Sequence, residues 1–272
     1  MAKISIKDKV VIITGASSGI GLACAKEFAN QGAKLMLAAR NIDKLNEIAA
    51  DLIAKGNWVE VCETDVSNED DCKNLIAKTI EKYSSIDILI NNAGVSMRAA
   101  FEQVDLSVLR RLMDVNFWGT VYCTKYALPY LLQSKGSVTG VSSVAGLHGL
   151  PGRTGYSSSK YAMHGFLDTL RIETLKKGLH VMLAIPGFTA SNVRFSALTA
   201  DGSQQGETPR NEEKMMTAEE VARRIASGIE KRKRSLLMTY EGKLTPLLKL
   251  LFPKWLDNMY YKHMKKEPDS SI

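Results

Sequence analysis

The strongest constraint on the fold of this chain is an alternation of short apolar runs with longer amphipathic segments, which begins at Val10 and continues to Thr239. Short apolar runs are typical of strands buried on both faces, and the segments between them have helical periodicity. This order indicates βαβ units. We therefore expect an α/β fold, with helices on both faces of a doubly wound parallel sheet. The expected strands are residues 10–14, 34–39, 58–62, 86–91, 137–142, 180–185 and 236–239.

The amphipathic segments predict helices over residues 20–30, 43–56, 106–133 and 154–177. Two further helices are expected after Ser67 and after Thr217, because an acidic residue three positions later gives each the spacing of a capping box. Within the 272 residues there is no internal repeat and no linker. We therefore expect one domain over residues 1–240, with residues 241–272 as its C-terminal extension. The polar stretch 190–214 lacks periodicity and is predicted to be a substrate lid.

The cysteine content and the net charge indicate which cellular compartment and which binding partners to expect. The four cysteines are widely spaced and form no C-x-x-C pair, which favours a reduced, cytoplasmic protein without a metal site. The apolar run near the N-terminus is too short for a signal peptide or a membrane span. The net charge of +7 is compatible with nucleic acid, anionic lipid, an acidic carrier protein or a phosphorylated cofactor. Because no aromatic-interleaved RNA motif is present, we expect no nucleic-acid partner.

A glycine-rich turn joins the first expected strand to the first helix, with the sequence Thr14-Gly15-Ala16-Ser17-Ser18-Gly19-Ile20-Gly21. Glycine permits backbone conformations and close approaches that a side chain forbids. A helix N-terminus also presents unpaired N–H groups and a positive dipole to a phosphate. The spacing G-x-x-x-G-x-G differs from the general dinucleotide fingerprint G-x-G-x-x-G. The turn predicts a pyrophosphate site, and a tight turn without a ligand is the alternative for this motif alone.

The end of the second expected strand bears on the choice between NAD and NADP. In dinucleotide folds an acidic residue at this place binds the ribose 2′-hydroxyl, whereas an arginine accommodates a 2′-phosphate. Here the strand is followed by Arg40, and no carboxylate occurs before Asp43. We therefore expect NADP(H), with Ser17 and Asn41 as further donors.

Tyr156 and Lys160 are four residues apart within an expected helix, so that a phenol and an ammonium group share one face. A nearby cation favours phenolate and lowers the pKa of a tyrosine, which brings it towards useful general acid/base strength. The spacing alone is also common on ordinary helix surfaces.

The motifs together resemble those of the short-chain dehydrogenase/reductase family, in their order and in their spacing. The resemblance extends from about Lys7 to Thr239, and in finer detail it is to the hydroxysteroid-dehydrogenase-like and carbonyl-reductase-like branch. It implies a Rossmann-type fold and a homodimer or homotetramer. The motifs are Thr14-Gly15-x-x-x-Gly19-x-Gly21, Asn91-Asn92-Ala93-Gly94, Asn116, Ser143, Tyr156-x-x-x-Lys160 and Pro186-Gly187.

The resemblance implies a catalytic role for four residues. Tyr156 would exchange a proton with the substrate oxygen, while Lys160 would bind the nicotinamide ribose and lower the pKa of Tyr156. Ser143 would hydrogen-bond the substrate oxygen, because the neighbouring Ser142 is expected on the opposite face of its strand. Asn116 would anchor a water molecule in a proton relay, a role compatible with an amide that also binds backbone groups.

The resemblance further implies a set of cofactor contacts. Asp65 would meet the adenine amino group, with an ordinary turn aspartate as the alternative. The remaining expected contacts are Val66 in the adenosine region, Asn92, Ala93 and Gly94 at the adenosine ribose, and Pro186, Gly187, Thr189 and Ser191 near the nicotinamide carboxamide.

The C-terminal extension is basic and amphipathic, with apolar residues at helical spacing from Leu244 to Tyr260 and breaks expected at Pro246 and Pro253. It fits a helix pair that packs over the domain or on a subunit partner, which is our expectation. The alternative is an interfacial segment that rests peripherally on anionic lipid. Two histidines flank the catalytic stretch. His164 is expected to be a satisfied polar residue, and His148 is expected in the substrate pocket with Leu147, Leu150 and Met97.

The sequence therefore predicts a metal-free oxidoreductase that transfers hydride between NADP(H) and a carbonyl or secondary alcohol. The neighbours of the expected site favour an apolar ketone, an aldehyde or a steroid-like or retinoid-like substrate. One alternative is a 3-oxoacyl-acyl-carrier-protein reductase, whose acidic carrier would meet the basic surface. An alternative of another class is a non-catalytic NADP-sensing or lipid-associated scaffold.

Overall fold

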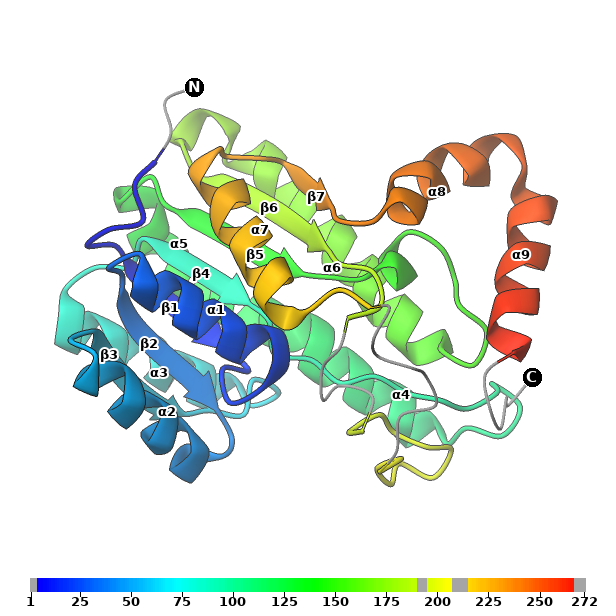
Figure 1. Ribbon diagram of the computed structural model, residues 1–272, viewed down its shortest axis with the longest axis horizontal. Helices are drawn as coiled ribbons and strands as arrows, with labels where there is room; N and C mark the ends of the chain where they lie inside the picture. Colours follow the sequence, from blue (N-terminus) through cyan, green and yellow to red (C-terminus); the bar gives the residue numbers. More distant parts are fainter. Residues whose placement is uncertain (1–3, 190–194, 207–214, 267–272) are drawn as a thin grey trace.

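The computed structural model of the chain describes residues 4–189, 195–206 and 215–266. Its strands form one parallel sheet in the order β3-β2-β1-β4-β5-β6-β7, which confirms the expected doubly wound architecture (Figure 1). Because the winding reverses between β1 and β4, a crevice is expected at the carboxyl ends of these strands. The strands are β1 (Val10–Thr14), β2 (Lys34–Ala39), β3 (Trp58–Glu63), β4 (Ile88–Asn91), β5 (Ser137–Val141), β6 (His180–Ile185) and β7 (Ser235–Leu237).

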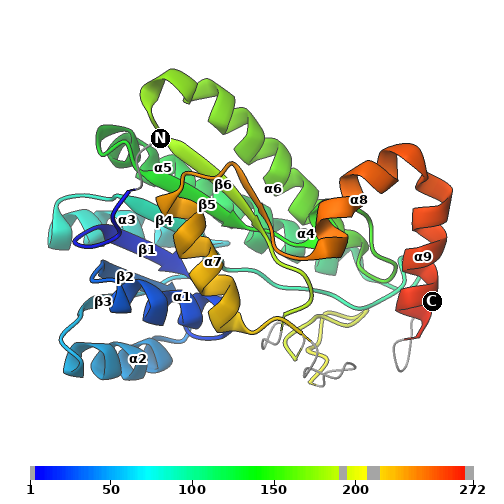
Figure 2. The ribbon, with the colours of Figure 1, turned by 45° about the horizontal axis from the view of Figure 1, so that its top comes forward.

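Helices cover both faces of the sheet, as Figure 2 shows. One face carries α1 (Gly19–Asn30), α2 (Ile42–Ala54) and α7 (Ala218–Glu230), whose buried side chains share one apolar cluster. The other face carries α3 (Glu69–Tyr83), α5 (Gly119–Gln133) and α6 (Thr154–Glu173), which share a second cluster. The sheet is therefore buried on both sides, which explains why its strands read as continuous apolar runs.

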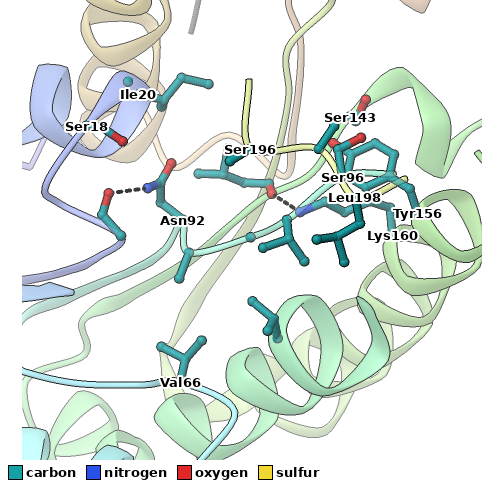
Figure 3. A pocket seen from close by; sticks show the side chains of 18 of the residues that line it. Ser18, Ile20, Val66, Asn92, Ser96, Ser143, Tyr156, Lys160, Ser196 and Leu198 are labelled. Atoms are coloured by element: carbon teal, nitrogen blue, oxygen red, sulfur yellow. Dashed lines mark hydrogen bonds between the residues drawn. The ribbon is translucent and has the colours of Figure 1, made fainter. Parts of the chain in front are cut away.

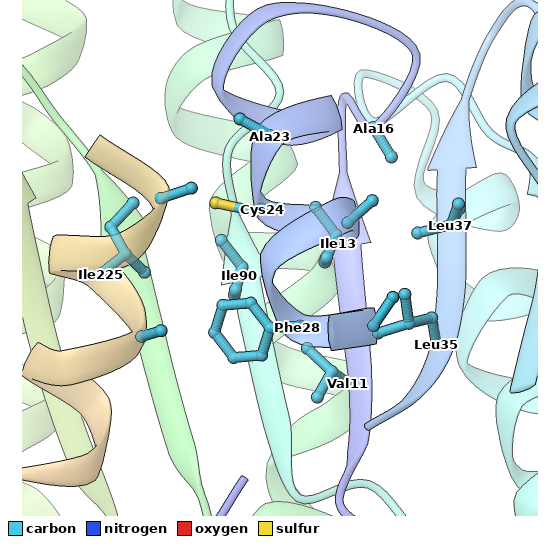
Figure 4. Close-up of a cluster of buried hydrophobic side chains, with 14 of the residues drawn as sticks. Val11, Ile13, Ala16, Ala23, Cys24, Phe28, Leu35, Leu37, Ile90 and Ile225 are labelled. Carbon is cyan, nitrogen blue, oxygen red and sulfur yellow. The ribbon is translucent and has the colours of Figure 1, made fainter. Parts of the chain in front are cut away.

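The first of these clusters is centred on Phe28 of α1, which is fully buried (Figure 4). Its ring packs among side chains of β1, β2, β4 and α7, including Val11, Leu35, Ile90 and Ile225. This packing holds the last turns of α1 against the sheet.

The helix boundaries differ from those expected most clearly in three places. The segment 106–133 is not one regular α-helix, because a π-helical turn over Asp114–Trp118 separates α4 (Leu106–Met113) from α5. The N-cap of α3 is Asn68, whose side chain accepts from the amides of Asp70 and Asp71, because Ser67 is instead bonded to Asp65. The helix expected to reach residue 177 ends at Glu173 and is followed by a 3-10 turn over Leu175–Lys177.

Two strand ends differ from expectation by two residues. β4 begins at Ile88 because Asp87 before it binds the amide of Val10 and the ammonium group of Lys9 at the base of β1. At the other end of the sheet β7 covers Ser235–Leu237, because the hydroxyl of Thr239 caps the next helix by accepting from the amide of Gly242.

Two helices follow the sheet, α8 (Tyr240–Leu251) and α9 (Pro253–Lys265), and they project from its β7 side (Figure 1). Pro246 does not break α8 as expected, whereas Pro253 takes the first position of α9, where no N–H donor is required. Leu256 and Tyr260 of α9 are buried against Ala145 and Leu150 of the domain. No helix among the described residues is long and apolar enough to span a membrane.

The segment expected to be a lid is described only in part. Residues 190–194 and 207–214 lie outside the described residues. Within 195–206, Leu198 is buried and forms isolated bridges with Met97 and Gln204. The described part of the segment therefore packs against the loop that follows β4.

Candidate active site

A cavity of about 530 Å³ opens at the carboxyl ends of β1, β4 and β5 (Figure 3). Ser18 and Ile20 lie at one end of it, whereas Ser143, Tyr156 and Lys160 gather at the other. Of the expected cofactor contacts, it is lined by Gly15, Ser17, Ser18, Gly19, Ile20, Arg40, Asn41, Asp65, Val66, Asn92, Ala93, Gly94, Pro186, Gly187 and Thr189. Gly21 does not line the cavity, and Ser191 lies outside the described residues.

The glycine-rich turn is shaped by two close backbone approaches. Gly15 has a φ of +65°, and a Cβ on it would lie 2.9 Å from the Cα of Ala93. A Cβ on Gly21 would lie 2.1 Å from the carbonyl oxygen of Gly15. Asn92 braces the turn by donating from Nδ2 to the carbonyl oxygens of Thr14 (2.9 Å) and Gly15 (3.2 Å). The turn therefore has no space for larger residues at these two positions.

The start of α1, like those of α4, α5 and α6, has no side-chain cap among the described residues. Ser18 is its N-cap residue, and the Ser18 side chain makes no capping hydrogen bond within the described part of the chain. In contrast, side chains of Asn41, Asn68 and Thr217 cap α2, α3 and α7. The start of α1 therefore offers its N–H groups and the Ser18 hydroxyl to an anion in the cavity.

Arg40 and Asn41 stand at the end of β2, where the cavity opens to solvent. The Arg40 side chain is exposed, and a shallow hollow beside it is lined by Asn41, Asp43 and Glu63. The Oδ1 atom of Asn41 accepts from the amide of Lys44 at 2.9 Å. Arg40 therefore brings positive charge to the end of β2. The side-chain oxygen of Asn41 is engaged in capping α2.

Asp65, Val66 and the loop after β4 bound the part of the cavity where adenosine is expected. Oδ1 of Asp65 accepts from the amide (3.0 Å) and the hydroxyl (2.6 Å) of Ser67. These two hydrogen bonds are those of an ordinary turn aspartate, which was the alternative for Asp65. They engage one of its two carboxylate oxygens. The amide of Ala93 donates to the Thr14 hydroxyl at 3.0 Å, which ties this loop to β1.

Ser143, Tyr156 and Lys160 come from two elements that meet at the far end of the cavity. Ser143 follows β5 and caps a 3-10 turn over Val144–Gly146, whereas Tyr156 and Lys160 lie one turn apart on α6. The Ser143 hydroxyl hydrogen-bonds the Tyr156 hydroxyl. Lys160 is 3% exposed, and its Nζ donates to the carbonyl oxygen of Val141 at 2.9 Å.

The electrostatics of this end differ from the expectation for Tyr156. Burial raises the pKa of the Tyr156 phenol, and the hydrogen bond from Ser143 and the charge of Arg153 oppose that rise. Lys160 Nζ lies 5.7 Å from the centre of the Tyr156 ring, and burial lowers the pKa of Lys160 to about 8. Desolvation therefore dominates, and the charge of Arg153 opposes it. The expected lowering of the tyrosine pKa by Lys160 stays a prediction.

Ser142 and Ser143 point in different directions, as the alternation of the strand predicts. Ser142 Oγ lies 2.6 Å from Nε2 of His164, on the side of α6. Burial lowers the pKa of His164 to about 4, so this histidine is a neutral hydrogen-bonding partner.

Asn116 lies in the π-helical turn between α4 and α5 and has no exposed surface. Its Oδ1 accepts from the amide of Val95 at 2.8 Å, and its Nδ2 donates to the Val95 carbonyl oxygen (2.9 Å) and to the Ser159 hydroxyl (2.8 Å). Ser159 in turn donates to the carbonyl oxygen of Tyr156 at 2.8 Å. Asn116 thus connects the cavity loop after β4 with the helix that carries Tyr156 and Lys160.

His148 does not lie in the substrate pocket, contrary to expectation. It is buried beneath α9, where its ring stacks on Tyr260 and its Nε2 lies 3.2 Å from the carboxylate of Asp257. Leu150 lines the cavity, whereas Met97 and Leu147 do not. The packing of α9 explains this change, because it draws the His148 side chain towards the C-terminal helices.

Several cavity residues were not among the sequence expectations. Arg153 was missed although it is the N-cap residue of α6, three residues before Tyr156. Leu198 and Ser196 come from the stretch expected as a lid, and no periodic signal marks them. The other such residues are Ala39, Thr64, Val95, Ser96, Arg111, Val115, Val141, Phe188, Ala197, Gln204 and Gln205.

Comparison with known proteins places this geometry in context. A protein-family model described as short chain dehydrogenase matches residues 9–201. A dehydrogenase/reductase SDR family protein 7-like of Dictyostelium discoideum is 38% identical over 265 residues, which are 95% of this chain and 82% of that protein. The 11-beta-hydroxysteroid dehydrogenase 1A of Arabidopsis thaliana is 36% identical over 261 residues, which are 92% and 73% of the two chains.

Among solved structures, a short chain dehydrogenase/reductase from Burkholderia phymatum in complex with NAD has a TM-score of 0.82 with this chain. It is 24% identical, and the alignment covers 93% of this chain and 96% of that one. At this identity the likeness concerns the fold.

Proposed function

The chain belongs to the short-chain dehydrogenase/reductase family, in its hydroxysteroid-dehydrogenase-like branch, and from this premise we propose that it transfers hydride between NADP(H) and an apolar ketone or secondary alcohol. As an oxidoreductase of this family it acts on CH–OH and C=O groups. The preference for NADP(H), the substrate class and the residue roles given below are our proposal.

The observation that carries the proposal is that one cavity joins an anion-binding turn to a buried phenol. Gly15 and Ser18 line it at one end, and Ser143, Tyr156 and Lys160 line it at the other. A dinucleotide is an extended molecule with a pyrophosphate near its middle and the nicotinamide at one end. A cavity that has a phosphate-binding turn at a distance from a reactive phenol fits this shape.

The residues present fit NADP(H) in three places. The close approaches at Gly15 and Gly21 and the uncapped start of α1 suit a pyrophosphate. Arg40 would bind the 2′-phosphate, and the Lys160 ammonium group would bind the nicotinamide ribose hydroxyls. When bound, the cofactor supplies a hydride for carbonyl reduction and accepts one in alcohol oxidation.

Tyr156 would move the proton that accompanies the hydride. Because burial raises its pKa, the phenol is protonated at neutral pH and can donate its proton to the substrate oxygen during reduction. In alcohol oxidation the same oxygen takes a proton back, for which it must first be ionised. Ser143 would hold the substrate oxygen beside the phenol, and Arg153 would favour the ionised phenol through its charge.

An apolar substrate is favoured by the walls near Tyr156. Leu150, Phe188 and Leu198 line this end of the cavity together with Val95 and Ala197. Such walls bind apolar surface through the hydrophobic effect, while Ser143 and Tyr156 supply the polar contacts that orient a carbonyl group.

The test is a panel of carbonyl compounds and alcohols, assayed by cofactor absorbance with NADPH and NADH in parallel. We expect turnover of apolar ketones with NADPH, loss of turnover in Tyr156→Phe with nearly unchanged NADPH binding, and normal turnover in the control Tyr122→Phe. Substantial activity of Tyr156→Phe would refute the acid/base role. Turnover of 3-oxoacyl thioesters in place of apolar ketones would favour the carrier-linked alternative, and NADPH binding without any turnover would favour the scaffold.

A further inference from the structure

The junction of α8 and α9 exposes a group of large apolar side chains, which we call the apolar corner. Figure 1 shows this junction at the outer edge of the molecule, where α8 turns into α9 away from the sheet. Among its members Leu250 is 78% exposed and Trp255 is 56% exposed. The apolar corner comprises Leu247, Leu250, Leu251, Phe252 and Trp255.

Burial within the domain does not account for these side chains. The apolar residues of α8 and α9 that pack on the domain are a different set, with Leu256 and Tyr260 buried against Ala145 and Leu150, and Leu248 and Met259 beside them. Single exposed leucines are common on proteins, but contiguous large apolar side chains with an aromatic residue mark an interaction surface.

Positive charge accompanies the apolar corner. Residues 240–266 contain six lysines but only two acidic residues, Glu241 and Asp257. Lys243 precedes Leu247 by four residues and Leu250 by seven, so it lies on the same face of α8, and Lys254 directly precedes Trp255. Both lysines are exposed. The corner therefore combines apolar and cationic side chains on one surface.

The helices that carry this surface are fixed to the domain. Lys249 Nζ donates to the carbonyl oxygen of Leu147 at 3.1 Å and to the Tyr161 hydroxyl at 2.6 Å. The hydroxyls of Thr245 and Tyr260 lie 3.2 Å apart and connect α8 with α9. A partner of the apolar corner thus meets a preformed surface and need not order it, which lowers the cost of binding.

We propose that the apolar corner inserts peripherally into an anionic lipid bilayer, with Lys243 and Lys254 at the headgroups. Exposed leucine and aromatic side chains on one face of a basic helix are typical of segments that lie in the membrane interface. A second copy of the chain fits less well, because a two-fold contact at the corner would bring the same lysines close to one another. The inference stands apart from the proposed reaction, since lipid binding requires neither cofactor nor turnover.

The experiment is flotation of the full chain with phosphatidylcholine vesicles, prepared with and without phosphatidylserine, at low and at high salt. We expect binding to the vesicles that contain phosphatidylserine and a loss of binding at high salt, because salt screens the lysines. Leu250→Ser is expected to weaken binding about tenfold through the lost apolar insertion. Lys254→Glu is expected to weaken it by about fivefold or more.

Matched controls come from the 3-10 turn after α6. Leu175 is 73% exposed, almost as much as Leu250, and Lys177 beside it is exposed like Lys254. Leu175→Ser and Lys177→Glu should therefore leave vesicle binding unchanged. Circular dichroism of each variant verifies that it is folded.

Tryptophan fluorescence provides a second readout. Brominated lipids should quench part of the emission of the wild type, and this quenched part should be absent in Trp255→Phe because Trp58 and Trp118 lie elsewhere in the fold. The proposal is wrong if vesicles with phosphatidylserine do not bind, or if Leu250→Ser and Leu175→Ser weaken binding equally. It is also wrong if vesicles fail to bind while Leu250→Ser dissociates a dimer in sedimentation velocity, since the corner is then a contact between copies.

Discussion

Replacement of Asn116 by alanine tests the connection between the cavity loop and α6. The amide makes three hydrogen bonds, two with the backbone of Val95 and one with the Ser159 hydroxyl. Asn116→Ala leaves the Val95 N–H and C=O groups without these partners, and each such loss costs roughly 1–3 kcal/mol. Ser159 keeps its bond to the Tyr156 carbonyl oxygen, so its loss is smaller. We expect the free energy of unfolding to fall by about 3 kcal/mol.

Asn91 provides the matched control, because it is also a buried asparagine. Its Nδ2 donates to the Thr124 hydroxyl at 3.0 Å, while its Oδ1 is buried and makes no hydrogen bond among the described residues. Asn91→Ala loses one hydrogen bond and also removes an unsatisfied acceptor, so a loss of only about 1 kcal/mol is expected.

The assay is equilibrium unfolding in urea followed by circular dichroism, with midpoint and slope compared for the wild type and both variants. Because Val95 lines the cavity, Asn116→Ala should also lower kcat/KM at temperatures where it remains folded. If Asn116→Ala is no less stable than Asn91→Ala, the hydrogen bonds between Asn116 and Val95 do not contribute to the free energy of unfolding as expected, and the prediction is wrong.

Three further predictions concern the cofactor and the proton. Arg40→Glu should lower kcat/KM for NADPH roughly a hundredfold, because a charge-assisted bond is replaced by repulsion, and leave NADH nearly unaffected; equal losses would contradict the phosphate role. Gly21→Ala should weaken cofactor binding by roughly tenfold or more in a fluorescence titration, since its Cβ would lie 2.1 Å from a backbone oxygen. Gly165→Ala, with no atom within 4 Å of the added Cβ, should bind normally. Arg153→Gln should raise the pKa of Tyr156 further by removing a cation, so the pH profile of alcohol oxidation should move to higher pH, while Arg153→Lys should retain the original profile. An unchanged profile in Arg153→Gln would show that its charge does not act on the phenol.

The fold could be predicted from the sequence because its determinants are local and repeated. The apolar run Val10–Thr14 predicts a buried strand, and the turn after it predicts a helix start, both within about ten residues. The spacing of Tyr156 and Lys160 likewise places both on one helix face. Wherever such signals compete, boundaries shift, as when Ser67 bonds Asp65 and leaves the cap of α3 to Asn68.

The candidate site could be described only from sequence motifs and tertiary packing together. Its glycines, Arg40, Ser143 and Tyr156 are marked by motifs, and those motifs lie where strands end. The environment of Tyr156 is not marked in this way, because desolvation depends on everything packed around it. Sequence reasoning named Lys160 as the cation near the phenol, and the packing adds the charge of Arg153.

Sequence alone determined the order of elements, the glycine-rich turn and the spacing of Tyr156 and Lys160, since each depends on residues near one another in the chain. Tertiary structure decided which distant side chains meet: Asn116 with Val95, and His148 with Asp257 of α9. It also decided which apolar residues of α8 and α9 are buried and which remain outside, as with Leu256 and Leu250. The physical reason is that hydrophobic periodicity identifies a buried face but not its partner, which depends on how helices far apart in sequence pack together.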